Sequence, residues 1–175
     1  MSGPAPADPT RFRALMGRWA TGVSVVTATA DGADAGLTVN SLASISLAPP
    51  TVLVSLTQDA DTLAVIARSG GFAVSFLAAD QRALSERFAR TIPAAEKFAG
   101  VGVHRGPRGA PILDGHVGAL ECRVTERRAV HDHALVLGEV HHVETGRDAL
   151  PLVFFRSGYA EADGPDRLRL PLPRG

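Results

Sequence analysis

Small polar side chains are concentrated in one segment of the chain, between residues 36 and 46. Five of them lie between apolar residues: Thr38, Asn40, Ser41, Ser44 and Ser46. Short hydroxyl and amide groups can satisfy the carbonyl and N–H groups at the edge of a planar heterocycle without blocking its faces. A polar strand edge whose hydroxyls bond to the local backbone has the same composition. Composition alone leaves both interpretations open.

Four histidines lie close together in the sequence and raise the question of a metal site: His131, His133, His141 and His142. In an extended strand His131 and His133 would face the same side, which suits chelation, whereas adjacent residues would face opposite sides. No carboxylate-rich or thiol-rich shell accompanies them, and a catalytic zinc ion needs three converging ligands. We therefore expect no metal here. His133 follows Asp132, which could fix its tautomer, and the alternative is a structural histidine bonded to the backbone.

Lys97 is the only lysine among 18 basic residues. An ammonium group can hold an anion as a point charge, although lysines on exposed helix faces are common. The chain shows no Ser-His-Asp order and no paired carboxylates of the kind that hydrolases use.

The overall composition excludes several other classes of protein. Equal numbers of basic and acidic residues, 18 of each, provide no broad positive surface for nucleic acid or anionic lipid. Cys122 is the single cysteine, so no internal disulfide can form, and a reducing, intracellular setting fits. Residues 1–9 lack the pattern of a signal peptide, and no apolar run is long enough to span a membrane. We expect a cytoplasmic protein.

The length of 175 residues suits one domain, which we expect at 10–162, with flexible termini at 1–9 and 163–175. Asp8 and Pro9 predict the start of a helix that runs past Trp19 and stops at Gly22. Further short helices are expected at 61–69, 80–88 and 93–98. Strands are expected near 23–29, 35–40, 44–47, 51–57, 71–77, 120–124, 134–143 and 150–159.

Many short strands and few short helices predict a β-dominated barrel. The stretch from Gly100 to Gly115 is rich in Gly and Pro and is expected to be a loop. Gly100 and Gly102 do not form a dinucleotide fingerprint, because the next glycine, Gly106, is off the required spacing and the segment follows a helix.

An ordered series of short motifs resembles the flavin reductase-like, FMN-binding split-barrel family, which includes the small reductase components of two-component flavin monooxygenases. The resemblance covers about residues 10 to 160. Its motifs are Phe12 to Met16, Trp19 to Thr27, Gly36 to Ser41, Ser44 to Ser46, Pro49-Pro50, Phe88-Ala89, Lys97-Phe98, Leu120 to Cys122, Asp132-His133, Gly138 to Val140, Pro151 to Phe155 and Tyr159.

The resemblance implies a set of cofactor-binding residues and one catalytic residue. Thr38, Asn40 and Ser41 would line the isoalloxazine ring, with Ser44 nearby. Lys97 would contact the flavin phosphate, where the family usually has Arg or Lys, and His133 would lie beside the flavin and the nicotinamide. The remaining residues that the resemblance assigns to the cofactor are Ser55, Phe98 and Tyr159.

The implied activity is hydride transfer from NADH or NADPH to FMN, or to FAD, which would supply reduced flavin to a partner monooxygenase. The family resemblance also implies a homodimer with flavin near the subunit interface. Two alternatives remain at this point. The chain could hold FMN as a prosthetic group for another redox substrate, or it could bind flavin without catalysis.

Overall fold

The structure is a computed structural model that describes residues 5–160, so the expected flexible segment 163–175 and residues 1–4 of the expected flexible N-terminus lie outside the described residues. The main element is a seven-stranded antiparallel sheet in the order β3-β2-β6-β9-β10-β5-β4. Its strands in chain order are β2 (Ser24–Ala30), β3 (Ala33–Val39), β4 (Ala43–Leu47), β5 (Pro50–Thr57), β6 (Gly71–Phe76), β9 (Gly118–Val130) and β10 (His133–Thr145).

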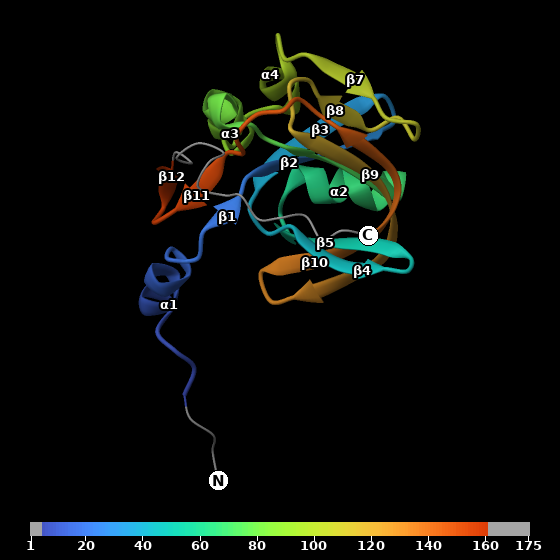
Figure 1. The fold of residues 1–175 in the computed structure, drawn as a ribbon. Helices are drawn as coiled ribbons and strands as arrows, with labels where there is room; N and C mark the ends of the chain where they lie inside the picture. The colour runs from blue at the N-terminus through green and yellow to red at the C-terminus, as the bar shows by residue number, and fades with distance from the viewer. Residues whose placement is uncertain (1–4, 161–175) are drawn as a thin grey trace.

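The sheet curves around helix α2 (Asp61–Ser69), which packs against β2, β3 and β6 (Figure 1). The edge strand β3 also contacts β5, although no ladder joins them in the described residues. The prediction of a β-dominated fold is confirmed, and the curved but unclosed sheet is consistent with a split barrel.

Alternation along β5 places Val52, Val54 and Leu56 in the core beneath α2. Strand β2 is buried over most of its length, because Val26 and Ala28 face that core while Val25 packs in a second cluster with Phe88. Cys122 is fully buried in the main core, and burial raises the pKa of its thiol to about 12. The thiol is therefore a core group and not a nucleophile.

Helix α1 (Pro9–Met16) begins as expected, because the Asp8 carboxylate accepts a hydrogen bond from the Arg11 amide at 2.8 Å. The expected end at Gly22 is wrong. The helix stops before Gly17, since glycine is unfavourable inside a helix and the following chain must extend to pair in a sheet.

The chain after α1 pairs in a small three-stranded sheet, in the order β1-β11-β12. Its strands are β1 (Thr21–Gly22), β11 (Val153–Phe155) and β12 (Gly158–Ala160). The sequence predicted one continuous strand through residue 159. The structure breaks it into a hairpin at Arg156 and Ser157, whose positive φ angles of 50° and 60° reverse the chain.

The loop expected from Gly100 to Gly115 contains a hairpin that the sequence did not predict. Its strands are β7 (Val103–Arg105) and β8 (Pro111–Leu113). The turn between them is anchored by Glu121 of β9, which is fully buried. Its carboxylate accepts hydrogen bonds from the backbone amides of Arg108 at 2.8 Å and Ala110 at 2.9 Å.

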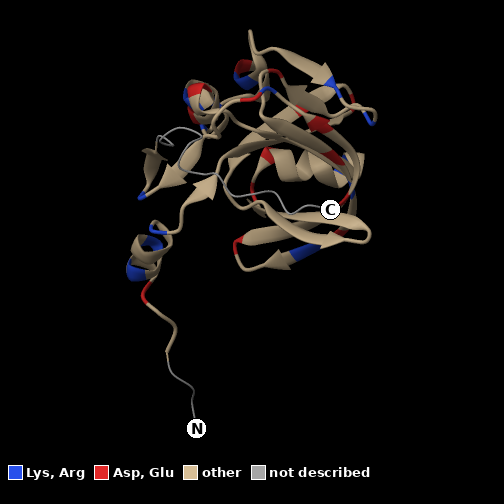
Figure 2. Cartoon of the chain, viewed as in Figure 1, with Lys and Arg blue, Asp and Glu red and all other residues tan. Residues whose placement is uncertain are grey.

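The other helices lie near the expected positions: η1 (Ala79–Gln81, a 3₁₀ turn), α3 (Arg82–Phe88) and α4 (Ala94–Phe98). Gly70 ends α2 with a left-handed φ of 67°. Figure 2 shows basic and acidic residues interspersed over the described elements. Within residues 5–160, no helix combines the length and the apolar character that crossing a membrane requires.

Candidate functional site

A cavity of about 830 Å³ lies between the end of α1, the start of β2 and the end of β3. This volume is within the range of sites for small molecules and cofactors. Its walls are mainly apolar and include Met16, Trp19, Val23, Leu42, Phe76 and Leu152. It contains two of the residues predicted from the 36–46 segment, Asn40 and Ser41.

The cavity also contains a polar group that the sequence did not single out. The hydroxyl of Thr21 is buried and has no hydrogen-bond partner among the described residues. A buried hydroxyl without a partner is costly, and a ligand with polar groups at its edge would satisfy it. The cavity volume, the free amide of Asn40 and the Thr21 hydroxyl fit the polar edge of a flavin ring.

Ser41 contributes to the cavity wall mainly through the backbone that it holds. Its hydroxyl donates to the Ser55 carbonyl oxygen at 2.8 Å and accepts from the Ser55 amide at 3.1 Å. The ladder between β4 and β5 ends at Ala43 and Leu53, so the side chain of Ser41 takes over the pairing that β4 no longer provides. Ser44 is exposed on β4 and is not among the residues that line this cavity.

A second cavity, of about 180 Å³, adjoins the first because Asn40 lines both. Ser85 of α3 lines this second cavity and contacts two of the predicted residues. The Thr38 hydroxyl donates to the Ser85 carbonyl oxygen at 2.7 Å, and the hydroxyls of Ser85 and Tyr159 are 2.8 Å apart. The structure thus joins Thr38 to Tyr159, far apart in the chain, through a serine that the sequence did not indicate, and Asn40 lines the same cavity.

Lys97 lies further along β3, in a third cavity of about 160 Å³ that also includes Asp61 and Arg90 and shares Ala89 with the second. Its side chain is buried, and Nζ donates to the carbonyl oxygens of Gly36 at 3.1 Å and Phe88 at 3.2 Å. Burial lowers the pKa of Lys97, and the charge of Asp61 opposes that effect. An ammonium group has three N–H donors, so one remains for another acceptor.

Phe98 follows Lys97 and has a packing role. Its ring meets the Phe88 ring edge to face, with centroids 5.0 Å apart. Both rings lie against Gly36, where an added Cβ would come within 2.6 Å of Phe88 Cε1. The glycine allows β3 to approach the two rings closely.

His133 begins β10 and is half-exposed, with Nδ1 2.9 Å from Oδ1 of Asp132. That hydrogen bond is the main cause of the lowered pKa of Asp132. The amide of Gln58 donates to the Asp132 carbonyl oxygen, so this turn lies beside the end of β5. The next residue, Asp59, lines the cavity of Lys97. His133 itself lines none of the three cavities described here.

Comparison with known proteins identifies the class. Residues 16–163 match the family described as "Flavin reductase like domain", and the chain belongs to this family. A fold of the same kind occurs in a putative flavin reductase from Haemophilus somnus, with a TM-score of 0.85 at 23% identity, covering 88% of this chain and 99% of that one.

Individual relatives are more specific. The reductase subunit HsaB of a flavin-dependent monooxygenase from Rhodococcus jostii is 36% identical over 91% of this chain and 80% of that protein. The actinorhodin polyketide dimerase of Streptomyces coelicolor is 41% identical over 88% of this chain and 86% of that protein. The NADH:FAD oxidoreductase SgcE6 of Streptomyces globisporus is 32% identical, with a TM-score of 0.84, covering 93% of this chain and all of that one.

Proposed function

We propose that this chain is an NAD(P)H:flavin oxidoreductase that reduces FMN or FAD and releases the reduced flavin to a partner monooxygenase. The observation that carries the proposal is the cavity of about 830 Å³ with Asn40 and the unpartnered Thr21 hydroxyl, in a chain of the flavin reductase family. The reaction moves one hydride from the nicotinamide C4 to the flavin N5, and the cofactors carry that chemistry themselves. The protein supplies orientation and excludes water.

Asn40 and Thr21 hold the polar edge of the ring in this proposal. The amide of Asn40 offers both donors and an acceptor, and the hydroxyl of Thr21 can donate one hydrogen bond and also accept. Trp19 and Met16 supply apolar walls. Thr38, Ser41, Ser55 and Tyr159 act as positioning residues, because their hydrogen bonds fix the backbone and α3 around the ring. Ser44 is exposed and lines neither cavity, so its proposed place near the ring rests on the family resemblance alone.

Lys97 is the proposed phosphate contact. The two carbonyl oxygens that it binds fix its position against β3 and leave one N–H for the ligand. As a point charge it needs no bidentate geometry. Phe98 holds the helix that carries it against the core.

His133 is the proposed residue for the dinucleotide, on the nicotinamide side of the flavin, and it needs no metal to act there. Its hydrogen bond to Asp132 places the proton on Nδ1 and leaves Nε2 free to accept a hydrogen bond from an N–H or O–H group of the dinucleotide. The half-exposed position suits a substrate that binds and leaves in each cycle. The cytoplasm, where NADH and NADPH are abundant, is the setting that we propose.

A homodimer completes the proposal. Helix α1 has no buried residue, and its apolar stripe continues into Trp19, which is 70% exposed. Leu47 on β4, 88% exposed, adds to the uncovered apolar surface. A second copy is the proposed cover for this surface, and sedimentation at micromolar concentration should then give twice 18.2 kDa. A species of 18.2 kDa alone would contradict the dimer.

One assay separates the proposed function from its alternatives. Steady-state oxidation of NADH and NADPH is measured with FMN, FAD, riboflavin or no flavin added. A reductase requires added flavin for turnover. A protein that purifies yellow and turns over without added flavin holds FMN as a prosthetic group. Flavin binding without any turnover would indicate a non-catalytic protein.

A further inference from the structure

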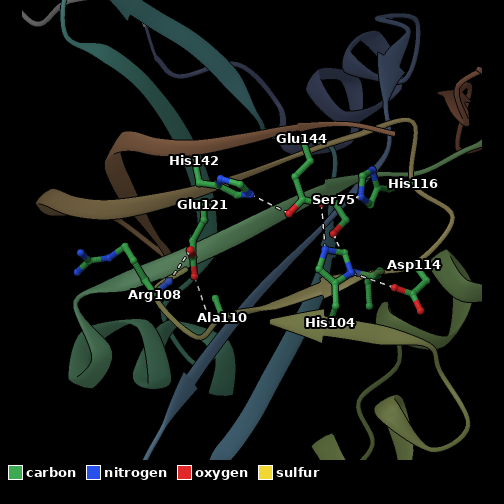
Figure 3. Close-up of polar contacts among 10 residues, drawn as sticks. Ser75, His104, Arg108, Ala110, Asp114, His116, Glu121, His142 and Glu144 are labelled. Carbon is green, nitrogen blue, oxygen red and sulfur yellow. Dashed lines mark hydrogen bonds and ion pairs between the residues drawn. The ribbon is translucent and has the colours of Figure 1, made fainter. Parts of the chain in front are cut away.

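A cluster of histidines and carboxylates lies at the junction of the β7–β8 hairpin and the main sheet (Figure 3). His104 comes from β7, His116 from the segment between β8 and β9, and Glu144 from β10. One potential ligand atom of each residue lies within 4.8 Å of the others. These residues lie outside the set of four histidines for which the sequence predicted no metal.

Glu144 is the centre of the cluster. Its Oε2 lies 2.9 Å from Nε2 of His104 and 3.4 Å from Nε2 of His116. Its Oε1 is held by Nε2 of His142 at 2.8 Å. Ligands at about 2.1 Å from a tetrahedral zinc ion are about 3.4 Å apart, so only a small spreading of these atoms is needed to admit the ion.

His104 has a carboxylate at each of its ring nitrogens. Nδ1 lies 3.0 Å from Asp114 Oδ1, and Nε2 lies 2.9 Å from Glu144 Oε2. A neutral imidazole has a single N–H, so it can donate to only one of these two carboxylates. Either a second proton or a metal ion must therefore occupy the other nitrogen. A histidine that donates Nδ1–H to a carboxylate and presents Nε2 to a metal is the usual arrangement in metal sites.

His116 is buried, with a side chain only 7% exposed, and its Nδ1 has no hydrogen-bond partner in the part of the chain described. The glycine at position 146 leaves room for His116, because a Cβ added to Gly146 would overlap the carbonyl oxygen and Nδ1 of His116. The other ring nitrogen, Nε2, faces the Glu144 carboxylate at 3.4 Å. Coordination of a metal ion through Nε2 would account for a histidine at this buried position.

We propose that His104, His116 and Glu144 bind a divalent transition-metal ion, zinc by preference, with a water molecule as the fourth ligand. Two imidazoles and a carboxylate suit zinc. Asp114 orients His104 through the hydrogen bond to Nδ1, and His142 fixes the orientation of the Glu144 carboxylate through the hydrogen bond to Oε1. The two carboxylates, Asp114 and Glu144, balance the charge of the ion.

The ion fixes the β7–β8 hairpin to β10, because its ligands come from both. In the described chain the hairpin otherwise reaches the sheet through contacts such as those of Glu121 and Ser75. A metal bound only by the folded chain stabilises it in proportion to occupancy. The ligands join the hairpin to β10 and none of them lines the proposed flavin cavity, so the role that we assign to the ion is structural.

Zinc binding is tested on the untagged, EDTA-treated full chain without flavin or NAD(P)H, so that its outcome is independent of reductase activity. Titration with zinc chloride in a calorimeter should give one equivalent, and cobalt(II) should give the visible absorption of a tetrahedral site. Glu144→Gln and His104→Gln should each weaken binding by at least about 100-fold. Asp114→Asn should weaken it by about 10–100-fold, the usual effect of losing an outer partner.

A matched control lies on the same strand. His141 pairs with Glu139 at 3.3 Å across the same two-residue spacing as His142 and Glu144, but outside the cluster. His141→Gln should bind zinc as the wild type does. Zinc should also raise the Tm of the wild type and of His141→Gln, but not of Glu144→Gln. Wild-type protein that binds no zinc, or equal affinity in folded Glu144→Gln, would overturn the proposal and leave a proton as the cation on His104.

Discussion

The hydroxyl of Ser41 is hydrogen-bonded to both backbone polar groups of Ser55, at 2.8 Å to the carbonyl oxygen and 3.1 Å to the amide. The Ser41 side chain thus continues the hydrogen bonding past the end of the β4–β5 ladder and joins the chain after β3 to β5. Ser41 therefore supports the wall of the cavity, whereas the Asn40 side chain, which has no hydrogen-bond partner within residues 5–160, is left to bind a ligand.

Asn40 and Ser41 should respond differently to replacement by alanine. Asn40→Ala should weaken flavin binding by about 1–3 kcal/mol, because ring groups lose their partners. Ser41→Ala should lower the free energy of unfolding by about 1 kcal/mol and affect flavin mainly through that loss. Fluorescence titration and urea unfolding separate the two effects. Unchanged flavin affinity in folded Asn40→Ala would mean that the ring binds elsewhere.

Lys97 should discriminate between flavins by their phosphate. Lys97→Met keeps the apolar stem of the side chain but removes the charge, so it should weaken FMN much more than riboflavin, which has no phosphate. Lys97→Arg should restore part of the FMN affinity, because it keeps the charge. Equal losses for FMN and riboflavin would assign Lys97 to its two carbonyl contacts alone.

His133 should affect the dinucleotide and not the flavin. His133→Asn should raise the KM for NAD(P)H or slow flavin reduction in stopped flow, while flavin affinity stays near wild type. His131→Asn is the matched control, because it lies in the same turn at a φ of 53° that asparagine tolerates. If both variants reduce flavin at the wild-type rate and KM, His133 is structural.

Glu121 should affect the stability of the fold and not the affinity for flavin. Its buried carboxylate accepts two amides of the β7–β8 turn, so Glu121→Gln, which replaces one acceptor by a donor, should cost about 1–3 kcal/mol of unfolding free energy. Glu126→Gln, an exposed change on the same strand, should cost little. Urea denaturation of the two variants tests this. A similar stability for both would show that the turn does not depend on Glu121.

The sequence predicted those elements whose signals are local. The Asp31-Gly32 turn joins β2 and β3, Asp8 caps α1, and Gly70 ends α2, and in each case the turn or cap residue itself carries the signal. The hairpin of β7 and β8 was missed because its strands are three residues long and depend on a carboxylate of β9.

The candidate site was predicted only in part, for a related reason. The polar segment around Asn40 has a local signature. The roles of Thr21 and Ser85 depend on contacts with distant parts of the chain, such as the 2.8 Å contact between Ser85 and Tyr159, and single polar residues give no signal for them. The cluster of His104 and Glu144 likewise forms only when β7 folds against β10.

Anaerobic reduction of free flavin tests the central claim most directly. A small amount of protein is mixed with a large excess of FMN and NADH in the absence of oxygen, and flavin absorbance is followed together with NADH oxidation. We predict that all the flavin is bleached, far beyond the amount of protein present, with one NADH oxidised for each FMN reduced. Bleaching limited to one flavin per chain, or no bleaching above the protein-free rate with either NADH or NADPH, would contradict a flavin reductase.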